Sequence, residues 1–246
     1  MKTVAFLGSK DIGLACLKHL YDRQEELDFH IAYVLTNGKG KDIDSFCEEH
    51  ALVLVNSLDD LLLKPCFDIG ISVQYHEILK KEHITRANEL FINLHMAPLP
   101  EYRGCNQFSF AILNNDTTFG TTVHRLETGI DSGDIIIERR FQIPPNCWVN
   151  ELHRLTYQES LILFEETLPL IFHGNYEFTP QSSLLDARGS EIHYRKEIEE
   201  IKIIDLAWDR DKIEKHIRAT LMPGFEPPYA IVDGRKIFLT EESHNK

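Results

Sequence analysis

The sequence lacks the features of a membrane protein and of a disulfide-stabilised secreted protein. No uninterrupted apolar run approaches the roughly 18–20 residues that a transmembrane helix needs. The apolar part of the N-terminus is too short for a secretory signal, so we expect a buried first strand there. The five cysteines are odd in number and form no C-x-x-C pair, which argues against a disulfide framework or a zinc site. These absences favour a cytoplasmic protein without a membrane partner.

Basic residues are scarce as well, and this limits the partners that the protein can bind. Lys and Arg number 26 against 39 Asp and Glu, which gives a formal net charge of −13. A protein that holds nucleic acid needs a basic face to displace counterions from phosphates, and no Lys/Arg cluster of useful length is present. We therefore expect no nucleic-acid partner. A small anion such as one diphosphate needs only a lysine and a few backbone amides.

The 246 residues suffice for one large domain and a smaller appendage. In the first half, short apolar runs alternate with amphipathic stretches, which is the pattern of βαβ units. The run 67–73 is apolar on both faces, as a central parallel strand should be. Further strands are predicted at 4–7, 29–35, 52–55, 90–94, 121–126 and 135–143, and helices at 12–20, 42–49, 106–113 and 151–172.

The composition changes after Thr179-Pro180, where a polar stretch occupies 181–189. The residues beyond it predict a helix at 209–219, a Pro- and Gly-rich loop, and a hairpin over 229–239 with an Asp-Gly turn. The predicted fold class is α/β, with a doubly wound, mostly parallel sheet over residues 1–180. Residues 181–246 are predicted to form a small C-terminal α+β subdomain that contains the β-hairpin.

The clearest candidates for chemistry are Asn93 and His95, at the end of a predicted strand. Residues i and i+2 of a strand project to one face, so both side chains can enter one site. Ligands of open parallel sheets bind beyond the carboxyl ends of the strands, where this pair falls. Taken alone, an Asn-x-His pair is more often structural than catalytic, so the neighbouring motifs decide its meaning.

Three motifs follow this pair in order. They are the loop Met96-Ala97-Pro98-Leu99-Pro100-Glu101-Tyr102-Arg103-Gly104, the strand Thr122-Val123-His124, and the loop Gly129-Ile130-Asp131-Ser132-Gly133-Asp134-Ile135-Ile136. With Asn93-Leu94-His95, they resemble the formyltransferase family that takes its one-carbon unit from N10-formyltetrahydrofolate. The resemblance covers roughly residues 2–178 and implies a formyltransferase-like Rossmann core. One departure is Ala97-Pro98, where the family commonly has Ser-Leu, and it touches the rigidity of the loop rather than its reactive groups.

The resemblance implies that Asn93, His95 and Asp131 are catalytic. Formyl transfer is the attack of a neutral amine on an amide-like carbonyl, and it passes through a tetrahedral oxyanion. An imidazole such as His95 suits proton transfer at neutral pH, and the Asn93 amide can donate to the oxyanion. Asp131 would hold and charge-stabilise His95, or relay its proton through water. His124 is more consistent with a structural role, and no metal is required.

The same resemblance predicts where the two ligands bind. Reduced folate is expected against the main chain of His76, Glu77, Ile78, Leu79, Glu127, Gly129 and Ile130. The amine substrate is expected to contact Ser9, Lys10, Tyr75, Arg103, Asn106, Phe225 and Tyr229. Ser9 and Lys10 occupy a βα turn whose amides and helix N-terminus suit an anion, with an ordinary turn as the alternative. Phe225 and Tyr229 either stack on a nucleotide base or fill the core of the subdomain.

The tail resembles that of enzymes that formylate the 4-amino group of nucleotide-linked 4,6-dideoxy sugars for surface polysaccharides such as lipopolysaccharide O-antigen. It favours dTDP-4-amino-4,6-dideoxyglucose as the acceptor and hints at a homodimer. GDP-linked amino sugars, glycinamide ribonucleotide and methionyl-tRNA remain open, and the charge of −13 disfavours the last. A nicotinamide-dependent oxidoreductase would need a glycine fingerprint that is missing. A non-catalytic nucleotide-sugar binding protein would not need Asn93, His95 and Asp131 together.

Overall fold

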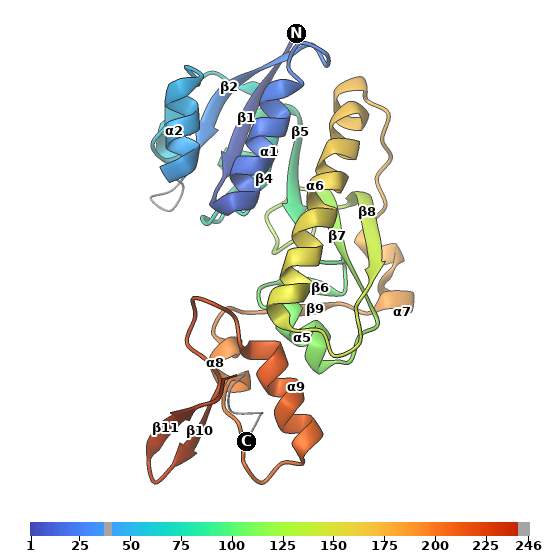
Figure 1. The fold of residues 1–246 in the computed structure, drawn as a ribbon. Helices are drawn as coiled ribbons and strands as arrows, with labels where there is room; N and C mark the ends of the chain where they lie inside the picture. The colour runs from blue at the N-terminus through green and yellow to red at the C-terminus, as the bar shows by residue number, and fades with distance from the viewer. Residues whose placement is uncertain (37–40, 241–246) are drawn as a thin grey trace.

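A seven-stranded sheet organises the computed structural model, which describes residues 1–36 and 41–240 (Figure 1). The strand order is β3-β2-β1-β4-β5-β7-β8, with β3 to β5 parallel and β7 and β8 antiparallel to their neighbours. The predicted α/β fold with a mostly parallel sheet is confirmed. The strands are β1 (Lys2–Gly8), β2 (Phe29–Leu35), β3 (Leu54–Val55), β4 (Phe67–Val73), β5 (Ala87–His95), β7 (Thr118–Arg125) and β8 (Ile135–Gln142).

Both faces of the parallel part of the sheet are covered, because its central strands are apolar on both sides. In β1, Val4 and Phe6 belong to one hydrophobic cluster, and the alternate residues Ala5 and Leu7 belong to another. The first cluster includes residues of α1 (Lys10–Asp22), α2 (Lys41–Glu49) and α6 (Val149–His173). The second includes residues of α3 (Leu58–Leu62), and Ile84 of α4 (Lys81–Ile84) packs against it.

A third hydrophobic cluster joins the core to the C-terminal tail, residues 181–240. It combines Ile112 of α5 (Gln107–Leu113) and Leu152 of α6 with Ala219 of α9 (Arg210–Thr220). The tail also contains η1 (Gln181–Ser183), α7 (Leu185–Arg188), β9 (Glu191–His193), α8 (Glu197–Ile201), β10 (Tyr229–Val232) and β11 (Arg235–Phe238). The hairpin of β10 and β11 lies where the Asp-Gly turn predicts it.

One pairing between tail and core was not expected from the sequence. The short strand β6 (Tyr102–Gly104) pairs in parallel with β9, with Gly104 opposite His193. The polar stretch 181–189 contains two short helices, η1 and α7. The tail therefore begins against the segment that follows β5.

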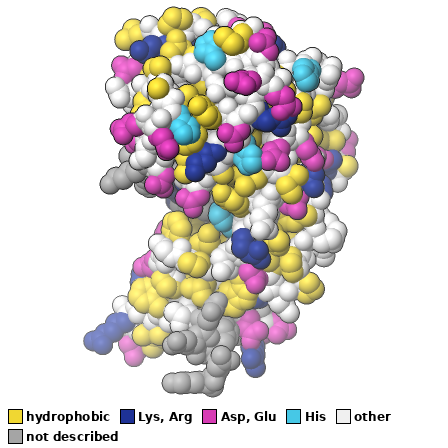
Figure 2. Space-filling model, turned by 45° about the horizontal axis from the view of Figure 1, so that its top comes forward, with side chains coloured by type: hydrophobic (Ala, Val, Ile, Leu, Met, Phe, Trp, Pro, Cys, Tyr) yellow, Lys and Arg dark blue, Asp and Glu magenta, His cyan; other side chains and the backbone are white. Residues whose placement is uncertain are grey.

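The surface mixes charges of both signs over the core, and hydrophobic side chains gather on the lower part of the molecule, around the tail (Figure 2). On the tail, Phe225 is 68% exposed and Ile231 is 53% exposed. Within the described ranges, no helix is both long and apolar enough to cross a bilayer.

Candidate active site

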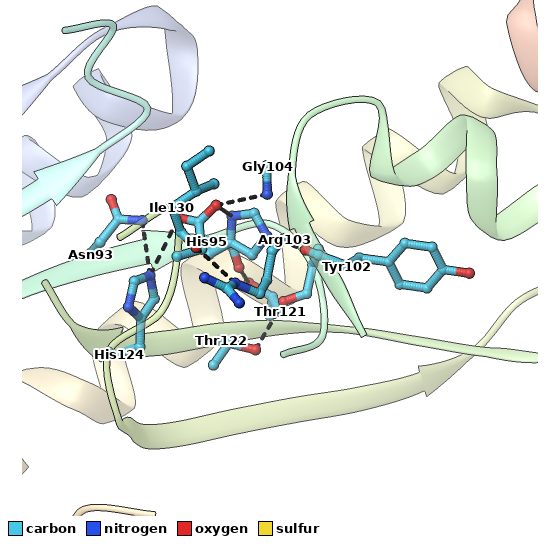
Figure 3. A network of polar contacts seen from close by, with 12 residues as sticks. Asn93, His95, Tyr102, Arg103, Gly104, Thr121, Thr122, His124 and Ile130 are labelled. Atoms are coloured by element: carbon cyan, nitrogen blue, oxygen red, sulfur yellow. Dashed lines mark hydrogen bonds and ion pairs between the residues drawn. The ribbon is translucent and has the colours of Figure 1, made fainter. Parts of the chain in front are cut away.

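Asn93 and His95 lie at the carboxyl end of β5, where the sequence pattern places them (Figure 3). The antiparallel neighbour β7 sets His124 opposite Asn93 and Thr122 opposite His95. This register brings the His124 ring to the Asn93 side chain, with 3.2 Å between Asn93 Nδ2 and His124 Nε2. The strand end therefore carries a cluster of three polar side chains rather than two.

The hydrogen bond of His95 to the main chain fixes which ring nitrogen can act as a base. His95 Nε2 lies 2.7 Å from the carbonyl oxygen of Tyr102. A carbonyl oxygen only accepts hydrogen bonds, so Nε2 carries the proton and donates it. In the neutral ring, Nδ1 then holds the lone pair, and it lies 3.7 Å from Asp131 Oδ2. The buried His95 ring thus presents a basic nitrogen toward the Asp131 carboxylate.

His124 is fixed in a matching way. Its Nδ1 lies 2.9 Å from the carbonyl oxygen of Arg125 and therefore donates. In the neutral ring, Nε2 is the acceptor for one N–H of Asn93 and also lies 3.6 Å from Asp131 Oδ1. The sequence pattern favours a structural role for His124. The structure places the ring inside the site, where it orients the Asn93 amide.

Asp131 completes the cluster from the loop between β7 and β8. Its backbone is left-handed, with φ of 41°, and its Oδ2 accepts a 2.9 Å hydrogen bond from the Gly104 N–H. Burial would raise the pKa of Asp131, but the facing His95 and His124 rings and the Gly104 amide together hold it well below its ordinary value. Asp131 is therefore a carboxylate at neutral pH.

Gln181 holds the Asp131 loop in place. Its side-chain nitrogen donates to the carbonyl oxygens of Asp131 and Gly133, at 2.8 and 2.7 Å. The side chain is 7% exposed. Sequence reasoning missed this residue, because a glutamine that bonds main-chain carbonyls 48 and 50 positions away leaves no local pattern.

Glycine at position 104 is required by the pairing of β6 with β9. Gly104 has φ of +87°, and an added Cβ would stand 2.2 Å from the carbonyl oxygen of His193. Only glycine adopts this conformation and tolerates this approach without strain. The glycine that ends the Tyr-Arg-Gly part of the loop motif thus allows β6 to pair with β9, and this pairing directs the Gly104 N–H toward Asp131.

The two threonines that precede His124 anchor the loop after β5. Thr121 Oγ1 donates to the carbonyl oxygen of His95 at 3.1 Å, and Thr122 Oγ1 donates to that of Ala97 at 2.9 Å. Both threonines are fully buried, so these bonds satisfy carbonyls that water cannot reach.

The two segments predicted to contact folate flank one hydrophobic cluster. Leu79 lies in this cluster, and Tyr75 and Leu126, next to the predicted segments, pack against it. Two apolar side chains in the segments point outward, since Ile78 is 84% and Ile130 is 43% exposed. The predicted folate contacts therefore lie on two loops that border the same cluster, and these two loops together are called the folate wall. The contacts are His76, Glu77, Ile78, Leu79, Glu127, Gly129 and Ile130.

Four of the predicted amine-substrate contacts, Ser9, Lys10, Tyr75 and Arg103, belong to the segments that follow β1, β4 and β5. Lys10 Nζ donates to Gln74 Oε1 at 3.0 Å, and the buried Ser9 bonds the main chain of Gln74. Tyr75 donates to Glu77 at 3.1 Å. Arg103 Nε donates to the Ile130 carbonyl at 2.8 Å, which ties the loop motif to the Asp131 loop.

The other predicted substrate contacts belong to the tail or bond to it. Asn106 Nδ2 donates to the carbonyl oxygen of Tyr194 at 2.9 Å. Tyr229 is 7% exposed and packs edge-on against Phe238, so its ring lies in the small core of the hairpin. Phe225 is 68% exposed, on the loop between α9 and β10. Of the two aromatic rings, only Phe225 is open to a ligand.

The fold and the site together fit an enzyme that transfers an acyl group to an amine. The carboxyl end of β5 presents an amide donor and a histidine, and the loop between β7 and β8 brings a carboxylate to them. The chain belongs to the formyl transferase family, whose model matches residues 18–167.

Two known proteins are similar to this chain in sequence. A GDP-perosamine N-formyltransferase of Brucella melitensis is 25% identical over 172 residues, which are 70% of this chain and 64% of that protein. A methionyl-tRNA formyltransferase of Clostridium beijerinckii is 27% identical over an alignment of 271 residues, covering 99% of this chain and 82% of that protein. The first match thus spans less than two thirds of the relative's length.

A solved structure shares the fold over nearly the whole chain. It is an N-formyltransferase from Helicobacter canadensis, in complex with folinic acid and dTDP-3-aminofucose, with a TM-score of 0.78 and 22% identity. The match covers 96% of this chain and 86% of that one, and it therefore includes the tail.

Proposed function

We propose that this protein transfers the formyl group of N10-formyltetrahydrofolate to the 4-amino group of a nucleotide-linked dideoxy amino sugar. The acceptor to test first is dTDP-4-amino-4,6-dideoxyglucose, in a cytoplasmic route to surface polysaccharide. The observation that carries the proposal is the meeting of Asn93, His95 and Asp131, with the lone pair of His95 directed to the Asp131 side of the site.

Each of the three residues has a chemical task that its contacts support. The Asn93 amide has two N–H groups. One is held by His124, and the other can donate to the formyl oxygen as that oxygen gains charge. As the amine nitrogen bonds to the formyl carbon, His95 Nδ1 takes a proton from that nitrogen, and Asp131 at 3.7 Å stabilises the imidazolium. The bond from the formyl carbon to N10 then breaks, and the imidazolium gives its proton to N10, so that tetrahydrofolate leaves.

The folate wall fits a flat, partly apolar ring. N10-formyltetrahydrofolate supplies the activated formyl group when bound. Residues 76–79 and 127–130 would hold its pterin through main-chain groups, and the exposed Ile78 and Ile130 offer apolar surface beside them. This wall adjoins the catalytic cluster, because Ile130 directly precedes Asp131.

Methionyl-tRNA is the competing acceptor, since the likeness to a methionyl-tRNA formyltransferase extends over nearly the whole chain. The net charge of −13 opposes the binding of a long polyanion. A nucleotide-linked sugar carries only a diphosphate, and the similarity to proteins described as acting on GDP-perosamine or binding dTDP-3-aminofucose supports it. A GDP-linked amino sugar is the nearest alternative acceptor.

A panel of acceptors tests the proposal. The protein would be incubated with N10-formyltetrahydrofolate and, separately, dTDP- and GDP-linked 4-amino sugars, glycinamide ribonucleotide and methionyl-tRNA. We expect release of tetrahydrofolate and a formylated product only with a nucleotide amino sugar. Formylation of methionyl-tRNA alone would refute the proposed acceptor while leaving the chemistry of the site intact. If none of the acceptors in the panel leads to release of tetrahydrofolate, the proposed transfer is refuted.

A further inference from the structure

The three residues Tyr194, Arg195 and Lys196, called the strap, connect β9 to α8 within the tail (Figure 1). Because β9 pairs with β6, the strap starts one residue beyond the partner of Gly104. The Gly104 N–H bonds Asp131. The strap therefore begins close to the Asp131 carboxylate in space, although it lies more than sixty positions away in the sequence.

The main chain of the strap is held firmly on both sides. Asn106 Nδ2 donates to the carbonyl oxygens of Tyr194 and Arg195, at 2.9 and 3.3 Å. On the other side, Glu197 Oε1 accepts from the Tyr194 N–H at 2.7 Å, and its Oε2 lies 3.0 Å from His193 Nδ1. The carboxylate next to the strap is thus already engaged with the main chain and with a histidine.

The two basic side chains of the strap are exposed. Neither the Arg195 guanidinium nor the Lys196 ammonium forms an ion pair or a side-chain hydrogen bond with any described residue. Four other arginines of the described residues are neutralised by carboxylates, whereas Arg103 donates to the Ile130 carbonyl. These pairs are Arg125–Glu127, Arg139–Glu159, Arg140–Glu101 and Arg188–Glu138, at 2.6 to 2.8 Å.

This contrast matters in an acidic chain. With a net charge of −13, the long-range field of the protein repels an anionic substrate, so local cations must supply the attraction. The guanidinium of an arginine matches phosphate oxygens with two parallel N–H groups, and a lysine adds a mobile point charge. The strap presents one of each.

We infer that the strap binds the diphosphate of the nucleotide-linked sugar and so determines that the acceptor is a sugar linked to a nucleoside diphosphate. This inference rests on the proposed function and adds the residues that recognise its substrate. In such a substrate, the phosphate on C1 and the amine on C4 stand at opposite ends of one sugar ring. An amine placed at His95 therefore leaves the diphosphate at the rim of the site, where the strap lies.

Lys10, a predicted substrate contact, offers a second cation for the diphosphate. Lys10 follows β1, which is separated from β5 by β4. At about 4.8 Å per strand, this puts the start of its turn roughly 10 Å from the end of β5. The Lys10 ammonium also contacts Gln74. We expect Lys10 to contribute less to diphosphate binding than Arg195 and Lys196 together.

Calorimetric titration with dTDP tests the inference on the full chain. The double variant Arg195→Ala/Lys196→Ala should raise the Kd for dTDP by about ten- to a hundredfold, the range for lost charge-assisted hydrogen bonds. The dependence of log Kd on log salt concentration should flatten in the same variant. The affinity for a reduced folate should stay within twofold of wild type, and Arg195→Lys should retain part of the dTDP affinity.

A matched control removes two positive charges elsewhere. Lys18 is exposed on α1 and Lys64 follows α3, so Lys18→Ala/Lys64→Ala should leave dTDP binding within twofold of wild type. If the strap variant binds dTDP as tightly as wild type does, the strap assignment is wrong and the proposed acceptor class still stands. If wild type binds none of dTDP, GDP and UDP, the proposed acceptor class is wrong and the strap assignment fails with it.

Discussion

At the scale of single residues, two main-chain carbonyls decide what the two histidines can do. The carbonyl of Tyr102 takes the Nε2 proton of His95, and the carbonyl of Arg125 takes the Nδ1 proton of His124. In the neutral rings, His95 Nδ1 is therefore free to act as a base, and His124 Nε2 accepts the hydrogen bond from Asn93. The pair Asn93 and His95 could be predicted from strand periodicity, but the role of His124 could not. Its position depends on the cross-strand register of β5 and β7.

Replacing Asp131 by Asn keeps the shape of the side chain and removes its charge. We expect kcat to fall by about a hundredfold or more, since the imidazolium of His95 loses its counter-charge. Steady-state kinetics with saturating folate and sugar nucleotide would measure this. A kcat within threefold of wild type would mean that Asp131 has no part in proton transfer.

The free energy of unfolding of the same variant should depend less on pH than that of wild type. Because the pKa of Asp131 is depressed in the folded state, its charge stabilises the fold above the ordinary carboxyl pKa of 3.8. This contribution is lost as the pH falls toward the folded-state pKa. Denaturant melts between pH 6 and pH 3 should therefore show a shallower decline in the free energy of unfolding for Asp131→Asn than for wild type.

At the scale of elements, the contacts that escaped sequence analysis are those between short segments far apart in the chain. Strands β6 and β9 have three residues each, too few for an alternating pattern. Their pairing nevertheless places the Gly104 amide at Asp131. The long helix α6 and the buried strand β4, by contrast, follow from periodicity and from an apolar run, and both lie close to their predicted bounds.

Gln181 tests the influence of such a contact on catalysis. Gln181→Ala leaves the buried carbonyls of Asp131 and Gly133 without their donor, at a cost of about 1–3 kcal/mol for each group left unsatisfied. We expect a roughly tenfold loss of kcat with little change in KM for either substrate. Gln142→Ala, at an exposed position of β8, is the control and should behave as wild type. Unchanged kcat in Gln181→Ala would show that the Asp131 loop keeps its conformation without the hydrogen bonds of Gln181.

At the scale of the whole molecule, the tail divides its aromatic residues between structure and surface. The sequence left open whether Phe225 and Tyr229 stack on a base or fill a core, because both roles need an aromatic ring. In the structure Tyr229 is buried against Phe238, and Phe225 is exposed. A homodimer formed through the tail stays a prediction, to which the exposed Ile231 and Ile237 of the hairpin lend apolar surface.

This division predicts different outcomes for the two rings. Phe225→Ala should weaken nucleoside diphosphate binding by about 1–3 kcal/mol, as for a lost base stack, and leave folate binding unchanged. Tyr229→Ala should lower the melting temperature, because it leaves a cavity in the hairpin core. Titration with each ligand beside a thermal melt separates these effects. Equal loss of both affinities in Phe225→Ala, in step with stability, would assign that ring to the scaffold too.

The most direct test of the account is the turnover of a His95→Asn variant with N10-formyltetrahydrofolate and a nucleotide-linked 4-amino sugar. Removing the base at Nδ1 should lower kcat by roughly a hundredfold to ten-thousandfold. Because the imidazole acts mainly in the transition state, the affinities for both ligands should change little. A kcat close to that of wild type, with both ligands bound normally, would contradict the assignment of His95 as the base in formyl transfer.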